Sequence, residues 1–172
     1  MTLRLILTRH AKSDWNDPLA SDHARVLNPR GRRAAPLIGQ WLAGNGHLPA
    51  LALVSDAART RETWELLSAE LPTPVPVRYL SALYAASPQT ILRALATAEE
   101  SAVMVIAHNP GIGALAAALA VRPPAHPGFL RYPTCATVVL EFDAAEWAQV
   151  RPRSGQVVDF VVPRDLEAVA SA

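Results

Sequence analysis

The sequence predicts an α/β fold, a three-layer αβα sandwich whose mainly parallel sheet has an antiparallel edge. Short apolar runs alternate with helix-patterned segments four times, which is typical of a parallel sheet covered on both faces. Two further strand-like runs follow near the C-terminus and have no helical segment between them. A length of 172 residues suits one domain, which we expect to span residues 1–172.

The first strand–helix unit is the most informative. The apolar run Leu3–Leu7 predicts a strand buried on both faces. A polar, irregular loop follows over residues 14–28. Asn28 then precedes a proline, the typical start of a helix, and apolar residues recur with helical spacing over Pro29–Ala43. We expect this helix to end at the glycines of residues 44–46.

The next three units repeat this pattern. Strands are expected at Ala50–Val54, Val75–Tyr79 and Ala102–Ala107. Helices are expected from near Ala57 to Leu71, from Pro88 to about Ala98, and from about Gly111 to Ala120.

The remaining segments end the chain without another strand–helix repeat. Residues 122–133 are rich in proline and glycine, which indicates a long surface loop. Two late strands are expected at Ala136–Phe142 and Val157–Val162, as an antiparallel pair, with a possible short strand between them at Trp147–Val150. Residues 165–172 are expected to form a frayed tail.

Composition excludes several classes of protein. Apolar residues make up 51% of the chain and charged residues 18%, as in globular proteins. The net charge of +1 gives no reason to expect a nucleic-acid or membrane partner. Cys135 is the lone cysteine, which excludes an internal disulfide and suits a reducing compartment. Without a signal-peptide pattern or a membrane span, we expect a cytoplasmic location.

Basic side chains follow three of the four parallel strands. Arg9 and His10 come after the first strand, Arg59 after the second and His108 after the fourth. The carboxyl ends of parallel strands meet at one edge, where open α/β sheets bind ligands. Two guanidinium groups and two imidazoles at one site would bind a dianionic phosphoryl group.

We expect His10 to be the nucleophile of this site, because a neutral imidazole can attack phosphorus and form a phosphohistidine. Arg59 and the amide groups of the helix start after Ser55 would stabilise the charge on the transferring group. Lys12 and Ser13 could also contact the phosphate, although a solvated loop lysine is the simpler interpretation of Lys12.

These motifs resemble those of the histidine phosphatase superfamily, which has the phosphoglycerate mutase-like fold. Thr8–Ala11 is similar to its RHG signature, with Ala11 in place of the glycine. Ser55, Arg59 and Thr63 match its S-x-x-x-R-x-x-x-T pattern, and residues 107–111 resemble its second-histidine turn. The resemblance implies that His10 is phosphorylated and that the other three basic residues bind phosphate. The short chain is most similar to the SixA-type phosphohistidine phosphatases.

One departure from the superfamily bears on the substrate. Residues 80–84 lack the glutamate that its mutases and phosphomonoesterases usually use as a proton donor. A phosphohistidine nitrogen leaves with less acid assistance than an alkoxide, so we expect hydrolysis of phosphohistidine in proteins. An alternative is a small-molecule phosphomonoesterase that uses Asp14, Asp17 or Asp22 as its acid. The simpler interpretation of these aspartates is that they cap or solvate their loop.

Two further alternatives are weaker. A phosphate-binding module without turnover would not need a nucleophile at His10. A metal centre would need ligand spacings that the sequence lacks, and Arg9 and Arg59 would repel a dication. We therefore expect no cofactor, no metal ion, and a phosphorylated protein or small molecule as the partner.

Overall fold

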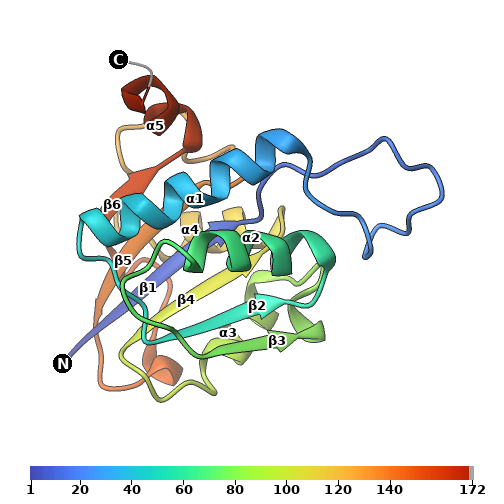
Figure 1. Cartoon of the computed structure of the whole chain (residues 1–172). Coiled ribbons are helices and arrows are strands. Elements are labelled where there is room, and N and C mark those ends of the chain that lie inside the picture. Colours follow the sequence, from blue (N-terminus) through green and yellow to red (C-terminus); the bar gives the residue numbers. More distant parts are fainter. Residues whose placement is uncertain (171–172) are drawn as a thin grey trace.

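The computed structural model describes residues 1–170. A six-stranded sheet forms the centre of the molecule (Figure 1). Its strand order is β3-β2-β4-β1-β5-β6. The first four strands of the chain pair in parallel, and β5 and β6 pair antiparallel at one edge. This confirms the predicted α/β fold with its antiparallel edge. The strands are β1 Thr2–Arg9, β2 Leu51–Ser55, β3 Val77–Leu80, β4 Ala102–Ala107, β5 Thr137–Asp143 and β6 Gln156–Val161.

Within residues 1–170, five α-helices flank this sheet. Asn28 caps α1 by accepting a hydrogen bond from the Gly31 amide at 2.8 Å. Ser87 caps α3 in the same way through the Thr90 amide at 3.2 Å. Both caps precede a proline at the first helical position, as predicted. The helices are α1 Pro29–Gly44, α2 Ala58–Ser68, α3 Pro88–Leu95, α4 Gly111–Leu119 and α5 Pro163–Ala170.

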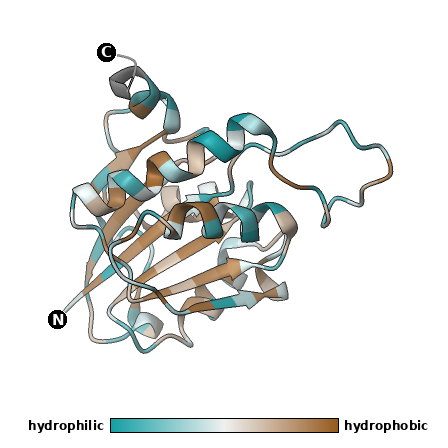
Figure 2. Cartoon of the chain, in the orientation of Figure 1, coloured by the Kyte–Doolittle hydropathy of each residue, from teal (hydrophilic) through white to brown (hydrophobic). Residues whose placement is uncertain are grey.

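Two apolar cores separate the sheet from its helical layers. Along β1, Leu5 and Leu7 face the core beneath α3 and α4, whereas Ile6 faces the core beneath α1 and α2. Figure 2 shows the apolar strands lying between the helices. Because successive strand residues point to opposite faces, an uninterrupted apolar run fits a strand that is buried on both sides. The three-layer prediction is therefore confirmed.

The C-terminal segment differs from its prediction. Residues 163–170 form α5, so the expected frayed tail over residues 165–172 is wrong for its described part, and residues 171–172 lie outside the described residues. Pro163 occupies the first helical turn, and Asp165 accepts a hydrogen bond from the Val162 amide at 3.2 Å. This proline and this cap start a helix that apolar content alone does not indicate. No helix within residues 1–170 is long and apolar enough to cross a membrane.

Two other segments also differ from their predictions. Residues 147–149 form a single 3₁₀ turn in place of the possible short strand, because the buried Trp147 ring donates to the Glu100 carbonyl at 2.8 Å. Residues 122–133 contain no helix or strand but are not wholly at the surface, since Phe129 and Tyr132 are buried. The Tyr132 hydroxyl donates to the Leu7 carbonyl at 2.6 Å and accepts from the Val138 amide at 3.1 Å.

Candidate active site

The central pair of parallel strands brings the two histidines together. In β1 and β4, Arg9 stands opposite Ala107, so the residues that follow each strand are neighbours. The His10 amide donates to the Ala107 carbonyl at 3.1 Å. The ring centroids of His10 and His108 are 5.3 Å apart. The predicted convergence at the carboxyl edge of the sheet is thus present.

His10 is neutral, and within residues 1–170 its Nε2 has no hydrogen-bond partner. Its Nδ1 lies 2.7 Å from the Ala11 carbonyl oxygen, which can only accept a hydrogen bond. Nδ1 therefore bears the proton, and Nε2 keeps its lone pair. Burial lowers the pKa of His10 to about 3, and the nearby His108, Arg59 and Arg9 add to this effect. At neutral pH the imidazole has the form that a nucleophile requires.

The backbone around His10 is held by α2 and by the segment that precedes β5. The Thr63 hydroxyl accepts from the Ala11 amide at 3.0 Å and donates to the Arg59 carbonyl at 2.7 Å. The Cys135 amide donates to the His10 carbonyl at 3.0 Å. Thr63 thus connects the turn after β1 to the helix that contains Arg59, which explains the four-residue spacing of the two residues.

His108 has the opposite tautomer. Its Nδ1 accepts from an Arg59 amino group at 3.2 Å, because a guanidinium can only donate. Its Nε2 therefore bears the proton and donates to the Ser55 hydroxyl at 2.7 Å. Burial, and then the charge of Arg59, lower the pKa of His108 to about 4. Ser55 is the last residue of β2, so three strand ends contribute to the site.

The two arginines provide donors for an oxyanion. Arg9 donates from one amino group to the Tyr132 carbonyl at 3.2 Å. The Nε–H groups of Arg9 and Arg59 are buried and have no acceptor among the described residues. Buried N–H groups ordinarily have a partner, and phosphoryl oxygens would supply one. Burial and the neighbouring charge of Arg59 lower the pKa of Arg9, as expected where two cations share a site.

Asp22 is the one proposed acid that reaches this site. Its carboxylate accepts from Arg59 at 3.1 Å and from Arg25 at 2.9 Å, and it also accepts from the Tyr84 hydroxyl. The hydrogen bonds from Arg25 and Tyr84, with the charge of Arg59, hold the pKa of Asp22 well below its usual range. At neutral pH Asp22 is therefore ionised and has no proton to give. Its place beside Arg59 makes it a positioning group in this structure.

The other two aspartates stay in their own loop. Asp14 accepts from the Asn16 amide at 2.7 Å, and Asp17 accepts from the Leu19 amide at 3.0 Å. These short-range bonds are typical of aspartates in turns. The structure does not bring Asp14 or Asp17 to the strand ends.

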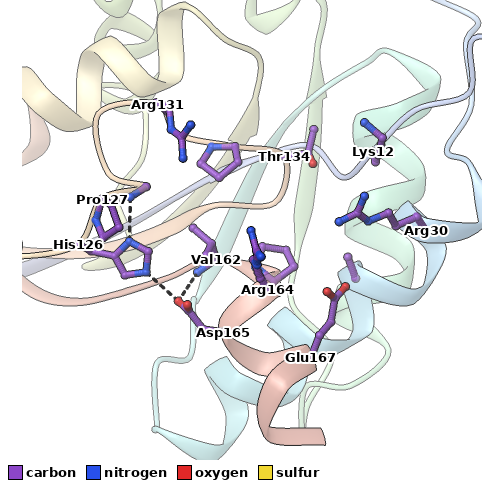
Figure 3. A pocket seen from close by; sticks show the side chains of 14 residues that line it. Lys12, Arg30, His126, Pro127, Arg131, Thr134, Val162, Arg164, Asp165 and Glu167 are labelled. Atoms are coloured by element: carbon purple, nitrogen blue, oxygen red, sulfur yellow. Dashed lines mark hydrogen bonds and ion pairs between the residues drawn. The ribbon is translucent and has the colours of Figure 1, made fainter. Parts of the chain in front are cut away.

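The side chains of Ser13 and Lys12 lie apart from the four central residues. The Ser13 hydroxyl is buried and accepts from Arg25. Lys12 is exposed, and its side chain lines a neighbouring cavity (Figure 3). Neither side chain has a hydrogen bond to Arg9, His10, Arg59 or His108 among the described residues.

Reasoning from the sequence missed Tyr84 as a site residue and left open whether Arg25 lies at the rim of the site. Arg25 is buried and contacts Asp22, Ser13 and the face of Trp15, whose ring centroid lies 3.6 Å from its guanidinium carbon. The Tyr84 ring meets His108 edge-on, with centroids 5.4 Å apart. Tyr84 immediately follows the 3₁₀ turn after β3, so its position after a parallel strand was a usable signal. Arg25 had no such signal, because its position depends on the fold of an irregular loop.

The fold and site define the class of protein. A sheet of this topology, with paired histidines and arginines at its carboxyl edge, is the arrangement of a histidine-based phosphatase. A model of the histidine phosphatase superfamily (branch 1) matches residues 5–87. The uncharacterized protein Rv1276c of Mycobacterium tuberculosis is 37% identical over 165 residues, covering 91% of this chain and 99% of that protein. The chain belongs to the histidine phosphatase superfamily and is a phosphatase.

Solved structures of SixA proteins are also similar to this chain. A candidate phosphohistidine phosphatase SixA from Nakamurella multipartitia superposes with a TM-score of 0.77 at 31% identity, covering 95% of this chain and 97% of that one. A candidate SixA from Agrobacterium tumefaciens gives a TM-score of 0.77 at 28% identity, covering 94% and 98%. The chain is therefore SixA-like in both sequence and fold.

Proposed function

We propose that this protein hydrolyses phosphohistidine in proteins, with His10 as the nucleophile. The observation on which the proposal depends is the state of His10, which is buried and neutral. Its Nδ1 is bound to the Ala11 carbonyl, and its Nε2 has no partner among residues 1–170. The similarity to the SixA structures supports this substrate class.

In the first step, Nε2 of His10 forms a bond to phosphorus while the phosphorus–nitrogen bond of the substrate breaks. Arg9, Arg59 and His108 surround the transferring group, and the guanidinium donors stabilise its charge. The leaving imidazole nitrogen takes a proton from water. In the second step, the hydroxide left by that water attacks phosphorus, the phosphorus–Nε2 bond of His10 breaks, and inorganic phosphate leaves.

The groups near the leaving position favour a phosphoramidate over an ester. The segment where an acid was sought contributes Tyr84, and its hydrogen bond to Asp22 raises the pKa of this phenol above the ordinary value. Asp22 itself is ionised. A departing alkoxide would require a proton that neither group supplies readily at neutral pH, whereas the phosphohistidine nitrogen leaves with less assistance.

Trapping the phosphoenzyme tests the mechanism. With radiolabelled phosphoramidate as a small donor, we expect the parent protein to become labelled within the first turnover and His10→Ala to remain unlabelled. His126→Gln removes a histidine outside the site and should label like the parent. Labelling of His10→Ala at the rate of the parent would overturn the proposal.

Comparing substrates tests the substrate class. We expect kcat/KM for phosphohistidine to exceed that for sugar phosphates by about a hundredfold, the contribution that a general acid typically makes. If sugar phosphates react faster and Asp22→Asn abolishes only their turnover, the enzyme is instead a phosphomonoesterase that uses Asp22 as its acid.

A further inference from the structure

A basic cavity lies beside the turn that contains His10. Lys12, Arg30, Arg131 and Arg164 line it, and we call this cavity the basic cleft (Figure 3). Its volume is about 570 Å³. The four cations come from four separate parts of the chain: the turn after β1, the first turn of α1, the segment before β5 and the first turn of α5. Folding therefore concentrates positive charge that the overall charge of +1 does not reveal.

The four cations are unpaired within residues 1–170. All four side chains are exposed, and none forms an ion pair or a side-chain hydrogen bond with another described residue. Two acidic residues also line the basic cleft. Asp165 is already bound to His126 at 2.9 Å and to the Val162 amide, which leaves Glu167 as the acidic group without such a partner. Positive charge therefore predominates and is available to a partner.

One segment forms a wall of both the basic cleft and the active site. Arg131 and Thr134 line the cleft, while the Tyr132 carbonyl between them accepts from Arg9 at 3.2 Å. On the opposite side, Lys12 follows the nucleophile by two positions. The basic cleft therefore lies next to the turn that contains His10 and shares a wall with the active site.

We propose that the basic cleft binds an acidic segment of the phosphorylated protein substrate, next to the phosphohistidine. This inference rests on the proposed function and specifies its substrate class further. Because the cations are long, exposed side chains, they suit carboxylates that stay partly solvated and are attracted at a distance. A small polyanion held for catalysis would be expected to have buried charged partners. The lysine and arginine side chains of the basic cleft are instead all exposed, which favours an acidic protein segment.

Peptide substrates test this inference. Two peptides share a central phosphohistidine and differ in having glutamates or glutamines beside it. For the parent protein, we expect kcat/KM to be about tenfold higher for the glutamate peptide at low ionic strength. Added salt should remove this preference, because it screens exposed charges.

Two matched variants locate the effect. The variant R30Q/R131Q/R164Q should lose the preference for the glutamate peptide while hydrolysing free phosphohistidine like the parent. The control variant R78Q/R93Q/R122Q removes three exposed arginines outside the basic cleft and should keep the preference. A preference retained in the first variant, or lost equally in both, would overturn the inference.

A binding measurement separates this inference from the proposed function. The unphosphorylated glutamate peptide should bind the parent, as measured by fluorescence anisotropy, and should not bind R30Q/R131Q/R164Q. If no form of the protein hydrolyses phosphohistidine, the proposed function fails, whereas this binding difference still supports the cleft as an acidic-segment site. A different result would identify a small polyanion as the occupant and overturn the inference. In that case the parent would bind tripolyphosphate, R30Q/R131Q/R164Q would not, and the parent would not discriminate between the two peptides.

Discussion

Each active-site histidine has one ring nitrogen fixed by a group whose chemistry allows only one tautomer. The Ala11 carbonyl fixes His10 and the Arg59 guanidinium fixes His108. Burial excludes the second proton from both rings. The protein therefore holds two neutral imidazoles, with ring centroids 5.3 Å apart, beside two cations. Protonating either ring in acid would add a buried positive charge next to these cations, which costs free energy.

This cost predicts a loss of stability at low pH. The folded pKa values of His10 and His108, about 3 and about 4, lie below the ordinary value of 6.5. As the pH falls below 6.5, the unfolded chain binds protons that the folded protein excludes, so the free energy of unfolding decreases. We expect the free energy of unfolding to fall by about 4 kcal/mol between pH 7 and pH 5, as measured by urea denaturation.

A double variant isolates the contribution of these two histidines. In His10→Gln/His108→Gln, most of the decrease between pH 7 and pH 5 should disappear. His126→Gln should keep it, because His126 lies outside the active site and bonds to Asp165. An unchanged decrease in the double variant would contradict the assignment.

The sequence predicted those site residues whose position follows from the sheet. Arg9, His10 and His108 come directly after strands, and Arg59 lies in the first turn of the helix after β2, so the order of parallel strands brings them together. Arg25 reaches the site through an irregular loop held by long-range contacts. Sequence periodicity contains no information about such contacts, so Arg25 could not be placed in the same way.

At the scale of elements, the start of α1 supports the turn after β1. The Asn28 amide donates to the Lys12 carbonyl at 3.0 Å. A Cβ at Gly31 would lie 2.2 Å from the same carbonyl oxygen. The helix therefore approaches the backbone of this turn so closely that only glycine fits at position 31.

This close approach predicts that Gly31→Ala is destabilising. We expect a loss of about 1–3 kcal/mol in the free energy of unfolding, because backbone must move to admit the methyl group. The same substitution at Gly44, the last residue of α1, is a matched control. Apart from the neighbouring residues and the backbone of the same helix, no atom of residues 1–170 lies within 4 Å of the position that a Cβ would occupy there. Gly44→Ala should leave stability unchanged or slightly raise it. Equal effects of the two substitutions in chemical denaturation would contradict this account.

Elements with strong periodicity and caps were predicted well, and short polar ones were not. Residues 165–172 were expected as a tail because so short a segment gives too little apolar repetition to indicate a helix, yet α5 spans Pro163–Ala170. The turn at residues 147–149 resembles a strand in sequence, but the indole of Trp147 is held by the Glu100 carbonyl. Such outcomes depend on a distant partner and not on the local pattern.

For the whole molecule, we predict activity without an added metal ion. Within residues 1–170 no three histidine, cysteine, aspartate or glutamate side chains gather closely enough to hold one. Arg9 and Arg59 would also repel a dication. Hydrolysis of phosphohistidine after dialysis against EDTA should therefore proceed at the original rate. A loss of activity that zinc restores would contradict this prediction. The cytoplasmic location expected from the sequence stays a prediction.

The position of β1 has a consequence for synthesis of the chain. β1 pairs with β4 and β5, so that Leu5 lies opposite Val103 on one side and Leu140 on the other. The strand that ends at the nucleophile is made first, yet both of its neighbours emerge much later. At typical rates of translation this interval is on the order of ten seconds, during which an apolar strand lacks its partners. The site at the end of β1 can therefore form only after β4 and β5 have both been synthesised.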